Sequence, residues 1–380
     1  MKTLHVITGL RQGGAEAVLY RLIATSITET EHIVVALGDS SYYGSRLLAL
    51  GAEVHTLEMP AGRVTFSGLL ALHRIIRASS PDVVQTWMYH ADLLGGLVAR
   101  WVGVRAICWG IHNSNLTAGK SSFSSRVVAR ICAHISSRVP MRIVCCSEQA
   151  ARLHQSIGYQ ASKFAIIPNG YDVTQFAPSK DKRVKLRDEW NICPDELLLG
   201  MVARWDPQKD HANLLSAMAL VKRTRPRLRC VLVGPNMDQQ NTELMALIAT
   251  NELQDSVILT GPHDNIPAVM NALDLHVLSS SYGEAFPNVV AEAMACETPC
   301  VVTEVGDAPL IVGETGRVVA PNDPGLLAQA IEQMLEVIES PQSREVKQAC
   351  RKRIVENFDI NRIARLYYDI WSECAFSEKK

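Results

Sequence analysis

Two glutamates, Glu284 and Glu292, stand eight positions apart around a segment that predicts the start of a helix. Pro287 suits the first helical position, so Glu284 is expected in the preceding loop and Glu292 two turns along the helix. Carboxylates accept hydrogen bonds from hydroxyl groups, and the first N–H groups of a helix attract phosphate. This combination fits a sugar nucleotide; the alternative is an ordinary buried helix with one capping glutamate.

Two cations and a pair of glycines could complete an anion site. Arg204 and Lys209 follow a predicted strand, where fixed positive charges could neutralise the two phosphates of a nucleotide diphosphate. Gly13 and Gly14 lie between a predicted strand and a helix, where backbone N–H groups can approach an anion. Surface charge or a tight turn would explain each feature alone. The loop lacks the G-x-G-x-x-G spacing, which disfavours a nicotinamide dehydrogenase.

The elements that must position these residues alternate between short β-branched runs and longer helical patterns. Strand, helix and strand in succession predict parallel pairing with right-handed crossovers, and so a doubly wound α/β sheet. The pattern restarts after Asn169-Gly170-Tyr171-Asp172, where a turn is expected. The predicted strands are 4–8, 32–37, 53–57, 82–87, 106–111, 142–146 and 164–167, then 197–203, 229–233, 257–260, 275–278, 300–303 and 317–319.

The sequence therefore predicts two Rossmann-like domains, at residues 1–170 and 171–358. Domains of this kind bind ligands at the carboxyl ends of their strands, so a cleft is expected where the two domains face each other. The tail at 359–380 carries Ile363, Leu366, Tyr367 and Ile370 at helical spacing. We expect this helix to cross back and brace the first domain.

The composition of the 380-residue chain is compatible with two buried cores, since 47% of residues are hydrophobic and 20% are charged. No apolar run reaches the roughly 18 to 20 residues of a membrane-spanning helix, and Met1 to Leu10 does not resemble a signal peptide. A soluble, cytoplasmic protein is expected. The ten cysteines contain no C-x-x-C pair, which favours reduced thiols over disulfides or a zinc site.

The net charge of −1 argues against a nucleic-acid partner but hides an uneven distribution. Residues 1–170 hold 16 basic and 9 acidic residues, whereas 171–380 hold 22 and 30. Between Arg100 and Ser147 there are seven basic residues and no acid, a block that attracts phosphate on a lipid surface or a soluble ligand. Within it, an amphipathic basic helix is predicted from the spacing of Phe123, Val127, Val128, Ile131 and Ile135. This helix faces either the core, with solvated arginines, or a membrane.

The combination of motifs resembles the retaining glycosyltransferases of the GT-B fold, of the family-four type common in bacterial surface polysaccharide synthesis. The resemblance covers nearly the whole chain. Its carriers are Gly13-Gly14, Arg204 with Lys209, the pair Glu284 and Glu292, and the stretch 300–303 leading into Gly306. Asp264-Asn265-Ile266-Pro267, Thr315-Gly316 and the expected hinge at Asn169-Gly170 also look like this family.

The resemblance implies a role for each motif. Arg204 and Lys209 would hold the donor diphosphate, Glu292 the ribose hydroxyls, and Glu284 the donor-sugar hydroxyls. Gly13 and Gly14 would approach the diphosphate from the first, acceptor-binding domain, and His112 would face the donor sugar. The implied catalytic residues are Glu284, His112, Arg204 and Lys209; the implied donor-binding residues are Gly13, Gly14, Arg204, Lys209, Gly234, Ile266, Phe286, Pro287, Asn288, Val289 and Glu292.

Two positions depart from the family pattern. Ala285-Phe286-Pro287 stands where the family often has Gly-Phe-Gly, and Glu297 stands where a glycine is usual. Neither change removes a proposed ligand, but both leave donor-sugar selection open. The sequence contains no D-x-D motif, which agrees with a fold that holds the diphosphate without a metal. No metal or other cofactor is therefore expected.

The activity implied is transfer of a sugar, with its anomeric configuration retained, from a nucleotide diphosphate sugar to an acceptor hydroxyl. A UDP-sugar of galactose or an N-acetylhexosamine is the expected donor, with GDP-mannose as an alternative. A polyprenyl-diphosphate-linked saccharide of O-antigen or exopolysaccharide synthesis is the expected acceptor, reached where the basic region meets the anionic inner face of the cell membrane. A GT-B-fold epimerase or phosphorylase and a non-catalytic nucleotide-binding scaffold remain alternatives.

Overall fold

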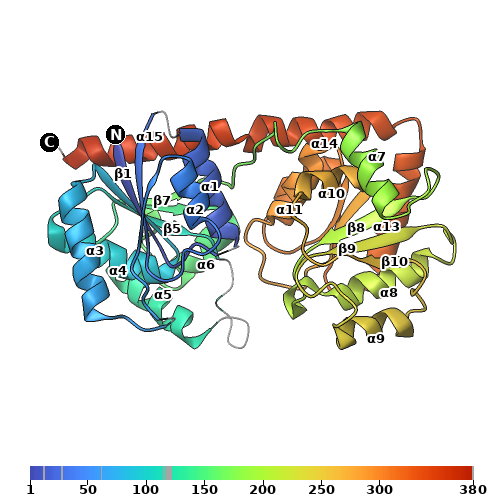
Figure 1. Ribbon diagram of the computed structural model, residues 1–380, viewed down its shortest axis with the longest axis horizontal. Coiled ribbons are helices and arrows are strands. Elements are labelled where there is room, and N and C mark those ends of the chain that lie inside the picture. The colour runs from blue at the N-terminus through green and yellow to red at the C-terminus, as the bar shows by residue number, and fades with distance from the viewer. Residues whose placement is uncertain (12, 27–28, 61, 114–115, 117–121, 379–380) are drawn as a thin grey trace. The chain divides into compact units, whose positions relative to one another are not determined.

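The computed structural model describes residues 1–11, 13–26, 29–60, 62–113, 116 and 122–378. Gln12 of the glycine loop and Lys120 of the basic block lie outside these residues. The chain forms two compact units (Figure 1). Unit 1 comprises Met1–Gly170 with Ile360–Lys380, and unit 2 comprises Tyr171–Asp359.

Unit 1 is built on a seven-stranded parallel sheet with the order β3-β2-β1-β4-β5-β6-β7. Val, Ile and other apolar residues fill these strands because helices cover both faces of a parallel sheet. The strands are β1 (Lys2–Ile7), β2 (Glu31–Ala36), β3 (Glu53–Thr56), β4 (Val83–Trp87), β5 (Ile107–Ile111), β6 (Arg142–Cys145) and β7 (Phe164–Ile166).

The helices of unit 1 form two separate cores, one on each face of the sheet (Figure 1). Helices α3, α4, α5 and α6 supply one core, and α1, α2 and α15 supply the other. Their bounds are α1 (Gly14–Ser26), α2 (Gly44–Ala49), α3 (Phe66–Ser79), α4 (Tyr89–Val102), α5 (Phe123–Ile135), α6 (Glu148–Ser156) and α15 (Ile360–Glu378).

The C-terminal helix α15 packs against α1 within unit 1. Ile363, Tyr367 and Trp371 are its deeply buried side chains. Trp371 donates a hydrogen bond from Nε1 to Gln85 Oε1 at 3.0 Å, so the helix is attached by a polar contact as well as by apolar burial.

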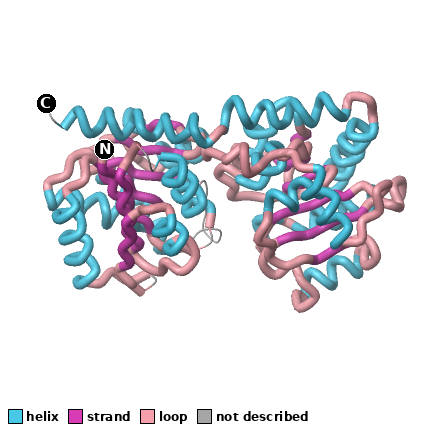
Figure 2. Tube along the Cα trace, turned by 45° about the horizontal axis from the view of Figure 1, so that its top comes forward, coloured by secondary structure: helices cyan, strands magenta, loops and turns pink. Residues whose placement is uncertain are grey.

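Unit 2 is built on a six-stranded parallel sheet with the order β10-β9-β8-β11-β12-β13. Figure 2 shows the strands of both units in magenta and the helices in cyan. Its strands are β8 (Leu198–Val202), β9 (Arg229–Val233), β10 (Val257–Leu259), β11 (Leu275–Leu278), β12 (Cys300–Thr303) and β13 (Arg317–Val319). Its helices are α7 (Lys180–Glu189), α8 (His211–Val221), α9 (Thr242–Thr250), α10 (Ile266–Ala272), α11 (Asn288–Ala295), α12 (Ala308–Val312), α13 (Pro324–Glu339) and α14 (Ser343–Phe358), with short 3₁₀ turns η2 (Pro207–Lys209) and η3 (Gly313–Thr315).

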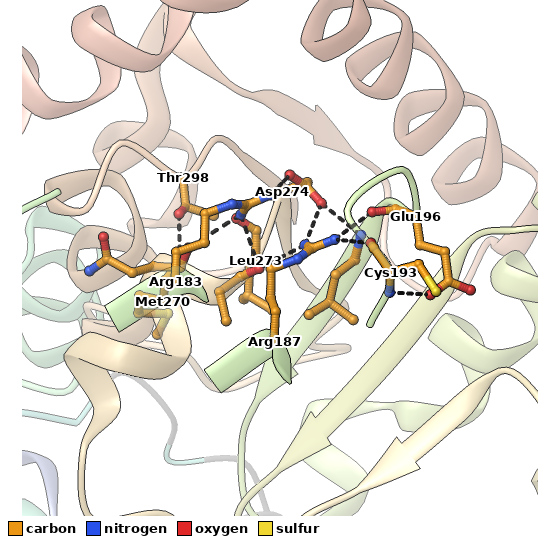
Figure 3. A network of polar contacts seen from close by, with 11 residues as sticks. Arg183, Arg187, Cys193, Glu196, Met270, Leu273, Asp274 and Thr298 are labelled. Atoms are coloured by element: carbon orange, nitrogen blue, oxygen red, sulfur yellow. Dashed lines mark hydrogen bonds and ion pairs between the residues drawn. The ribbon is translucent and has the colours of Figure 1, made fainter. Parts of the chain in front are cut away.

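A buried charge network fixes α7 to the amino-terminal edge of the unit 2 sheet (Figure 3). Asp274 accepts hydrogen bonds from Arg183 at 2.6 Å, from Arg187 at 3.1 Å and from the backbone N–H of Leu198 at 2.8 Å. Leu198 is the first residue of β8, and Asp274 directly precedes β11. The network therefore lies at the end of the sheet opposite to the one where ligands bind.

The predicted doubly wound architecture is confirmed, and each predicted strand has its counterpart in one of the two sheets. Two local details were wrong. Pro287 has the extended backbone of an N-cap (φ −71°, ψ 104°), so α11 begins one residue later than predicted. As a result Glu292 is the fifth residue of α11, just beyond its first turn, and not two turns along the helix.

Candidate active site

The carboxyl-terminal edge of the unit 2 sheet gathers most of the predicted donor-binding residues. Arg204 and Lys209 follow β8, Gly234 follows β9, Ile266 begins the helix after β10, and Glu284 follows β11. Because the strands are parallel, these loops emerge at the same edge of the sheet.

Lys209 and Glu284 form an ion pair at this edge. Their side chains are only 13% and 8% exposed, so the pair is shielded from solvent. Ser280 donates a hydrogen bond to the same oxygen, Glu284 Oε1, at 2.6 Å. The structure thus brings Lys209, a predicted diphosphate ligand, together with Glu284, the predicted sugar ligand. Ser280 is a third member of this group and was not predicted from the sequence.

Arg204 forms its side-chain hydrogen bonds within its own loop. Its Nε contacts Asp206 Oδ2 at 3.1 Å and its Nη2 contacts Gln208 Oε1 at 3.3 Å. The side chain is 57% exposed, which leaves the guanidinium accessible to a ligand. Asp206 also accepts the Gln208 N–H at 2.9 Å, and so it caps the turn that carries Lys209.

The start of α11 has no N-cap hydrogen bond to the Pro287 side chain and follows a packed aromatic residue. Phe286 is buried and packs against Tyr171 and Phe358, with ring centroids 6.5 and 5.4 Å away. Its side chain is therefore part of the unit 2 core, and only its backbone could reach a donor. Asn288 accepts a hydrogen bond from the Tyr171 hydroxyl at 2.8 Å, and Glu292 is half-buried on the same helix.

Two glycines allow the loops of this edge to approach each other. Gly234 has φ 144°, and a Cβ there would overlap the backbone carbonyl of Ala203. Gly306 has φ 61°, and a Cβ there would overlap the backbone of Glu284. Any larger residue would push away the loops that carry Arg204 and Glu284.

The carboxyl edge of the unit 1 sheet carries a different chemistry. His112 follows β5 and stacks on Trp87, at the end of β4, with ring centroids 5.2 Å apart. Burial lowers the pKa of His112 to about 4, so the imidazole is neutral near pH 7. Its Nε2 is buried and has no hydrogen-bond partner among the described residues. A neutral imidazole of this kind can donate to or accept from a hydroxyl group.

Two further features of unit 1 lie at the same edge. Met88, the residue after β4, has φ 72° and ψ 157°, a strained conformation for a residue with a side chain.

At the start of α1, a Cβ on Gly13 would overlap the Glu16 carboxylate, which lies over the glycine loop. Burial raises the pKa of this carboxyl group. The predicted contact of Gly13 and Gly14 with a diphosphate stays a prediction.

Sequence reasoning missed Ser280 and Asp206, and it did not anticipate the backbone conformation of Met88. The three consecutive serines after β11, Ser279 to Ser281, were the only visible signal for Ser280. Asp206 could have been noticed as an Asp-Pro helix start beside Arg204. Nothing in the sequence marks the strained backbone of Met88, because methionine has no preference for positive φ.

The predicted basic helix, α5, does not turn most of its apolar stripe toward the core. Small residues, Ala129, Cys132 and Ala133, form its buried face. Phe123, Val127 and Ile131 are 74%, 39% and 43% exposed. The helix packs against α4, whose Leu97 and Trp101 are also exposed. We call the exposed apolar residues of these two helices, with Arg100, Arg126, Arg130 and Arg138, the α4–α5 surface.

Comparisons with known proteins assign the family. A family model described as Glycosyltransferase Family 4 matches residues 12–175, and one described as Glycosyl transferases group 1 matches residues 196–337. The first model covers most of unit 1 and extends to residue 175, just inside unit 2, and the second lies within unit 2. The chain belongs to the family-four glycosyltransferases. The predicted family resemblance is therefore confirmed.

Curated relatives of this glycosyltransferase cover most of the chain. The putative glycosyltransferase EpsF of Bacillus subtilis is 25% identical over 310 residues, which are 80% of this chain and 79% of EpsF. UDP-Gal:alpha-D-GlcNAc-diphosphoundecaprenol alpha-1,3-galactosyltransferase of Escherichia coli is 24% identical over 316 residues, again 80% of this chain and 79% of the relative.

Solved structures agree on the fold of the glycosyltransferase. HepE of Anabaena in complex with UDP superposes with a TM-score of 0.86 at 21% identity, over 98% of this chain and 100% of HepE. Sucrose-phosphate synthase from Thermosynechococcus elongatus gives 0.82 at 19% identity, over 98% of this chain and 99% of the synthase. The fold is GT-B, as predicted.

Membrane-spanning helices and metal-binding clusters are both absent from the described residues. In the part of the chain that the structure describes, no helix is long and apolar enough to cross a bilayer. Within the same residues, no group of three or more His, Cys, Asp or Glu side chains could hold a metal ion.

Proposed function

We propose that this glycosyltransferase moves a sugar from a UDP-sugar to a hydroxyl of a lipid-linked saccharide and retains the anomeric configuration. The observation that carries the proposal is the shielded Lys209–Glu284 pair at the carboxyl edge of the unit 2 sheet. There a cation for the diphosphate and a carboxylate for the sugar hydroxyls meet. The names of the relatives support the substrates, since one is a UDP-galactose transferase acting on a diphosphoundecaprenol-linked sugar and HepE was solved with UDP-glucose.

Unit 2 supplies the donor site in this proposal. Lys209 and the exposed Arg204 stabilise the diphosphate as negative charge develops on it during departure. The N–H groups at the start of α11 add a helix-end contact to phosphate, and Glu292 accepts hydrogen bonds from the ribose. These groups supply the charge that other enzymes draw from a metal, so we propose that no metal is needed. The leaving phosphate accepts the proton of the incoming hydroxyl.

Unit 1 supplies the acceptor side. The neutral Nε2 of His112, which has no hydrogen-bond partner in the part of the chain that the structure describes, is suited to hydrogen-bond a sugar hydroxyl, and the stacked Trp87 ring fixes the imidazole orientation. The α4–α5 surface serves the lipid part of the acceptor. Its exposed aromatic and aliphatic side chains suit the bilayer interface, and its arginines suit anionic headgroups at the inner face of the cell membrane.

A screen of nucleotide sugars tests the reaction. The purified chain is incubated with UDP-galactose, UDP-N-acetylhexosamines or GDP-mannose and a polyprenyl-diphosphate-linked saccharide. We expect UDP release that depends on acceptor, and an α-linked product by NMR from an α-configured donor. E284A should abolish transfer, whereas E243A, on an exposed α9 carboxylate, should not. A β-linked product would refute retention, and UDP formation without acceptor would favour another reaction.

Vesicle binding tests the membrane part. An R126Q/R130Q/R138Q variant should bind phosphatidylglycerol vesicles about a hundredfold more weakly, at roughly 1 kcal/mol for each arginine near the surface. F123S should also weaken binding, while F376S, which removes an equally exposed phenylalanine from α15, should not. Equal binding of the arginine variant and the unmodified chain would exclude the α4–α5 surface as the membrane contact.

A further inference from the structure

The Glu284 carboxylate has two donors on one oxygen. Lys209 Nζ and Ser280 Oγ both contact Oε1, the serine at 2.6 Å. Glu284 is 7% exposed, so water cannot easily replace either donor. Removing the partner of a buried charge is costly, because the charge loses hydration without compensation.

The proposed function creates a conflict at this carboxylate. The Lys209 ammonium has three N–H donors, but a donor diphosphate would compete with Glu284 for its position and charge. When the diphosphate draws Lys209 toward itself, Glu284 must stay in place to hold the sugar hydroxyls. A second donor that does not move with the lysine would meet this need.

Ser280 is fixed independently of Lys209. The serine is fully buried, and its backbone carbonyl accepts a hydrogen bond from Thr303 Oγ1 at 2.6 Å. Thr303 ends β12, so this bond ties Ser280 to the neighbouring strand of the sheet. The hydroxyl of the adjacent Ser279 bonds elsewhere, to the backbone carbonyls of Lys209 and Asp210, both at 2.9 Å.

We propose that Ser280 is a positioning residue that holds the Glu284 carboxylate in place while Lys209 transfers from Glu284 to the donor diphosphate. This inference rests on the proposed function for the donor site and adds a residue to it. The two adjacent serines then have separate roles. Ser280 supports the sugar-binding carboxylate, and Ser279 supports the loop of the diphosphate-binding lysine.

Kinetics of matched serine variants test the inference. A hydrogen bond to a charged group corresponds to about a tenfold to hundredfold effect, so S280A should lower kcat by that factor. Its affinity for UDP alone should change less than twofold, because the diphosphate contacts remain. S280T, which restores the hydroxyl, should recover most of kcat. S279A should have the opposite effect: the main change should be weaker UDP binding, with a smaller change in kcat.

Thermal unfolding without ligand gives a second measure. S280A should lower the Tm by about 3 °C or more in the unmodified chain and by less than about 1 °C in an E284A background. Equal losses in both backgrounds, together with parallel falls in kcat and UDP affinity for S280A, would overturn the inference. A chain that binds no UDP and transfers no sugar would instead overturn the proposed function, and the thermal cycle would still decide whether Ser280 holds Glu284.

Discussion

The two units share one topology but equip the carboxyl edges of their sheets differently. Each places the first strand of the unit third in the sheet, in the orders β3-β2-β1-β4 and β10-β9-β8-β11. The unit 1 edge carries a neutral His112 stacked on an aromatic ring. The unit 2 edge carries charged side chains that already pair with each other, Lys209 with Glu284 and Arg204 with Asp206.

The proposed phosphate site therefore does not coincide with the basic excess of the sequence. Residues 1–170 carry the excess of basic residues, and five of these lie on α3, α4 and α5. Residues 171–380 are acidic overall and still place two cations where a diphosphate would bind. One edge is suited to hydroxyl groups and the other to phosphates, although both arise from the same arrangement of strands.

Among the substitutions that test this contrast between the two edges, Lys209→Ala should have the largest effect. Loss of a cation that stabilises the leaving diphosphate should lower kcat about a hundredfold to a thousandfold. UDP release in the presence of acceptor measures this. Lys352→Ala is the matched control, since Lys352 is 73% exposed and pairs with Glu356 on the surface of unit 2. A Lys209 variant as active as this control would remove the chemical contrast between the two edges.

A second prediction separates structural from functional charges within unit 2. Asp274→Ala leaves Arg187 buried without its partner and should cost about 3–5 kcal/mol in the free energy of unfolding. Asp195→Ala breaks an exposed pair with Arg227 and should cost less than about 1 kcal/mol. Urea denaturation measures both. UDP affinity of the folded Asp274 variant should match the unmodified chain, because Asp274 lies at the opposite edge; a large loss of affinity would contradict this.

The strands and the family were predictable because their signals are local. β-branched runs between helical patterns identify strands, and spaced residues such as Glu284 and Glu292 identify the family. The orientation of a helix relative to the core was harder to predict from the sequence. The periodicity of α5 revealed an apolar stripe but not which face is buried, and the small residues Ala129 and Ala133 proved to face the core. Small side chains allow α5 to approach α4 closely, an advantage that hydrophobicity alone does not capture.

Pairings between distant residues could not be predicted. The Lys209–Glu284 pair joins positions 75 residues apart, and the sequence treated its members as ligands of two different parts of the donor. The same holds for Asp274, which accepts hydrogen bonds from two separate segments, α7 and the start of β8. Such contacts depend on how the strands align in the sheet, and a local sequence pattern does not predict this alignment.

A third prediction concerns a chain of buried imidazoles in unit 1. Trp87 Nε1 donates to His5 Nδ1 at 3.3 Å, His5 Nε2 then donates to His32 Nδ1 at 3.0 Å, and His32 Nε2 donates to Ser26 Oγ at 2.9 Å. This order requires both imidazoles to be neutral. Burial lowers the pKa of His32 from 6.5 to about 4 and lowers that of His5 well below its ordinary value.

Stability should therefore depend on pH through this chain. Between pH 6.5 and about 4 the unfolded chain binds protons at these histidines and the folded chain does not, so stability falls as the pH falls. Over this pH window, the free energy of unfolding loses about 3 kcal/mol through the titration of His32. Urea denaturation from pH 4.5 to 7.5 measures the slope. H32Q should make the slope less steep, because one of several histidines with a lowered pKa is removed, while H134Q, at an exposed position on α5, should leave it unchanged.

The smallest expected effect is an absence of pH dependence at the unit 1 edge. With a pKa of about 4, His112 is neutral throughout the range from pH 5.5 to 8, so the hydrogen bond that we propose between His112 and an acceptor hydroxyl should not depend on pH there. The ratio of kcat for the unmodified chain to kcat for H112Q should vary less than twofold over this range. An imidazole with its ordinary pKa near 6.5 would be about nine-tenths protonated at pH 5.5. A ratio that falls severalfold at low pH would mean that His112 is exposed to water during turnover, and the contrast between a neutral and a charged edge would then hold only for the ligand-free protein.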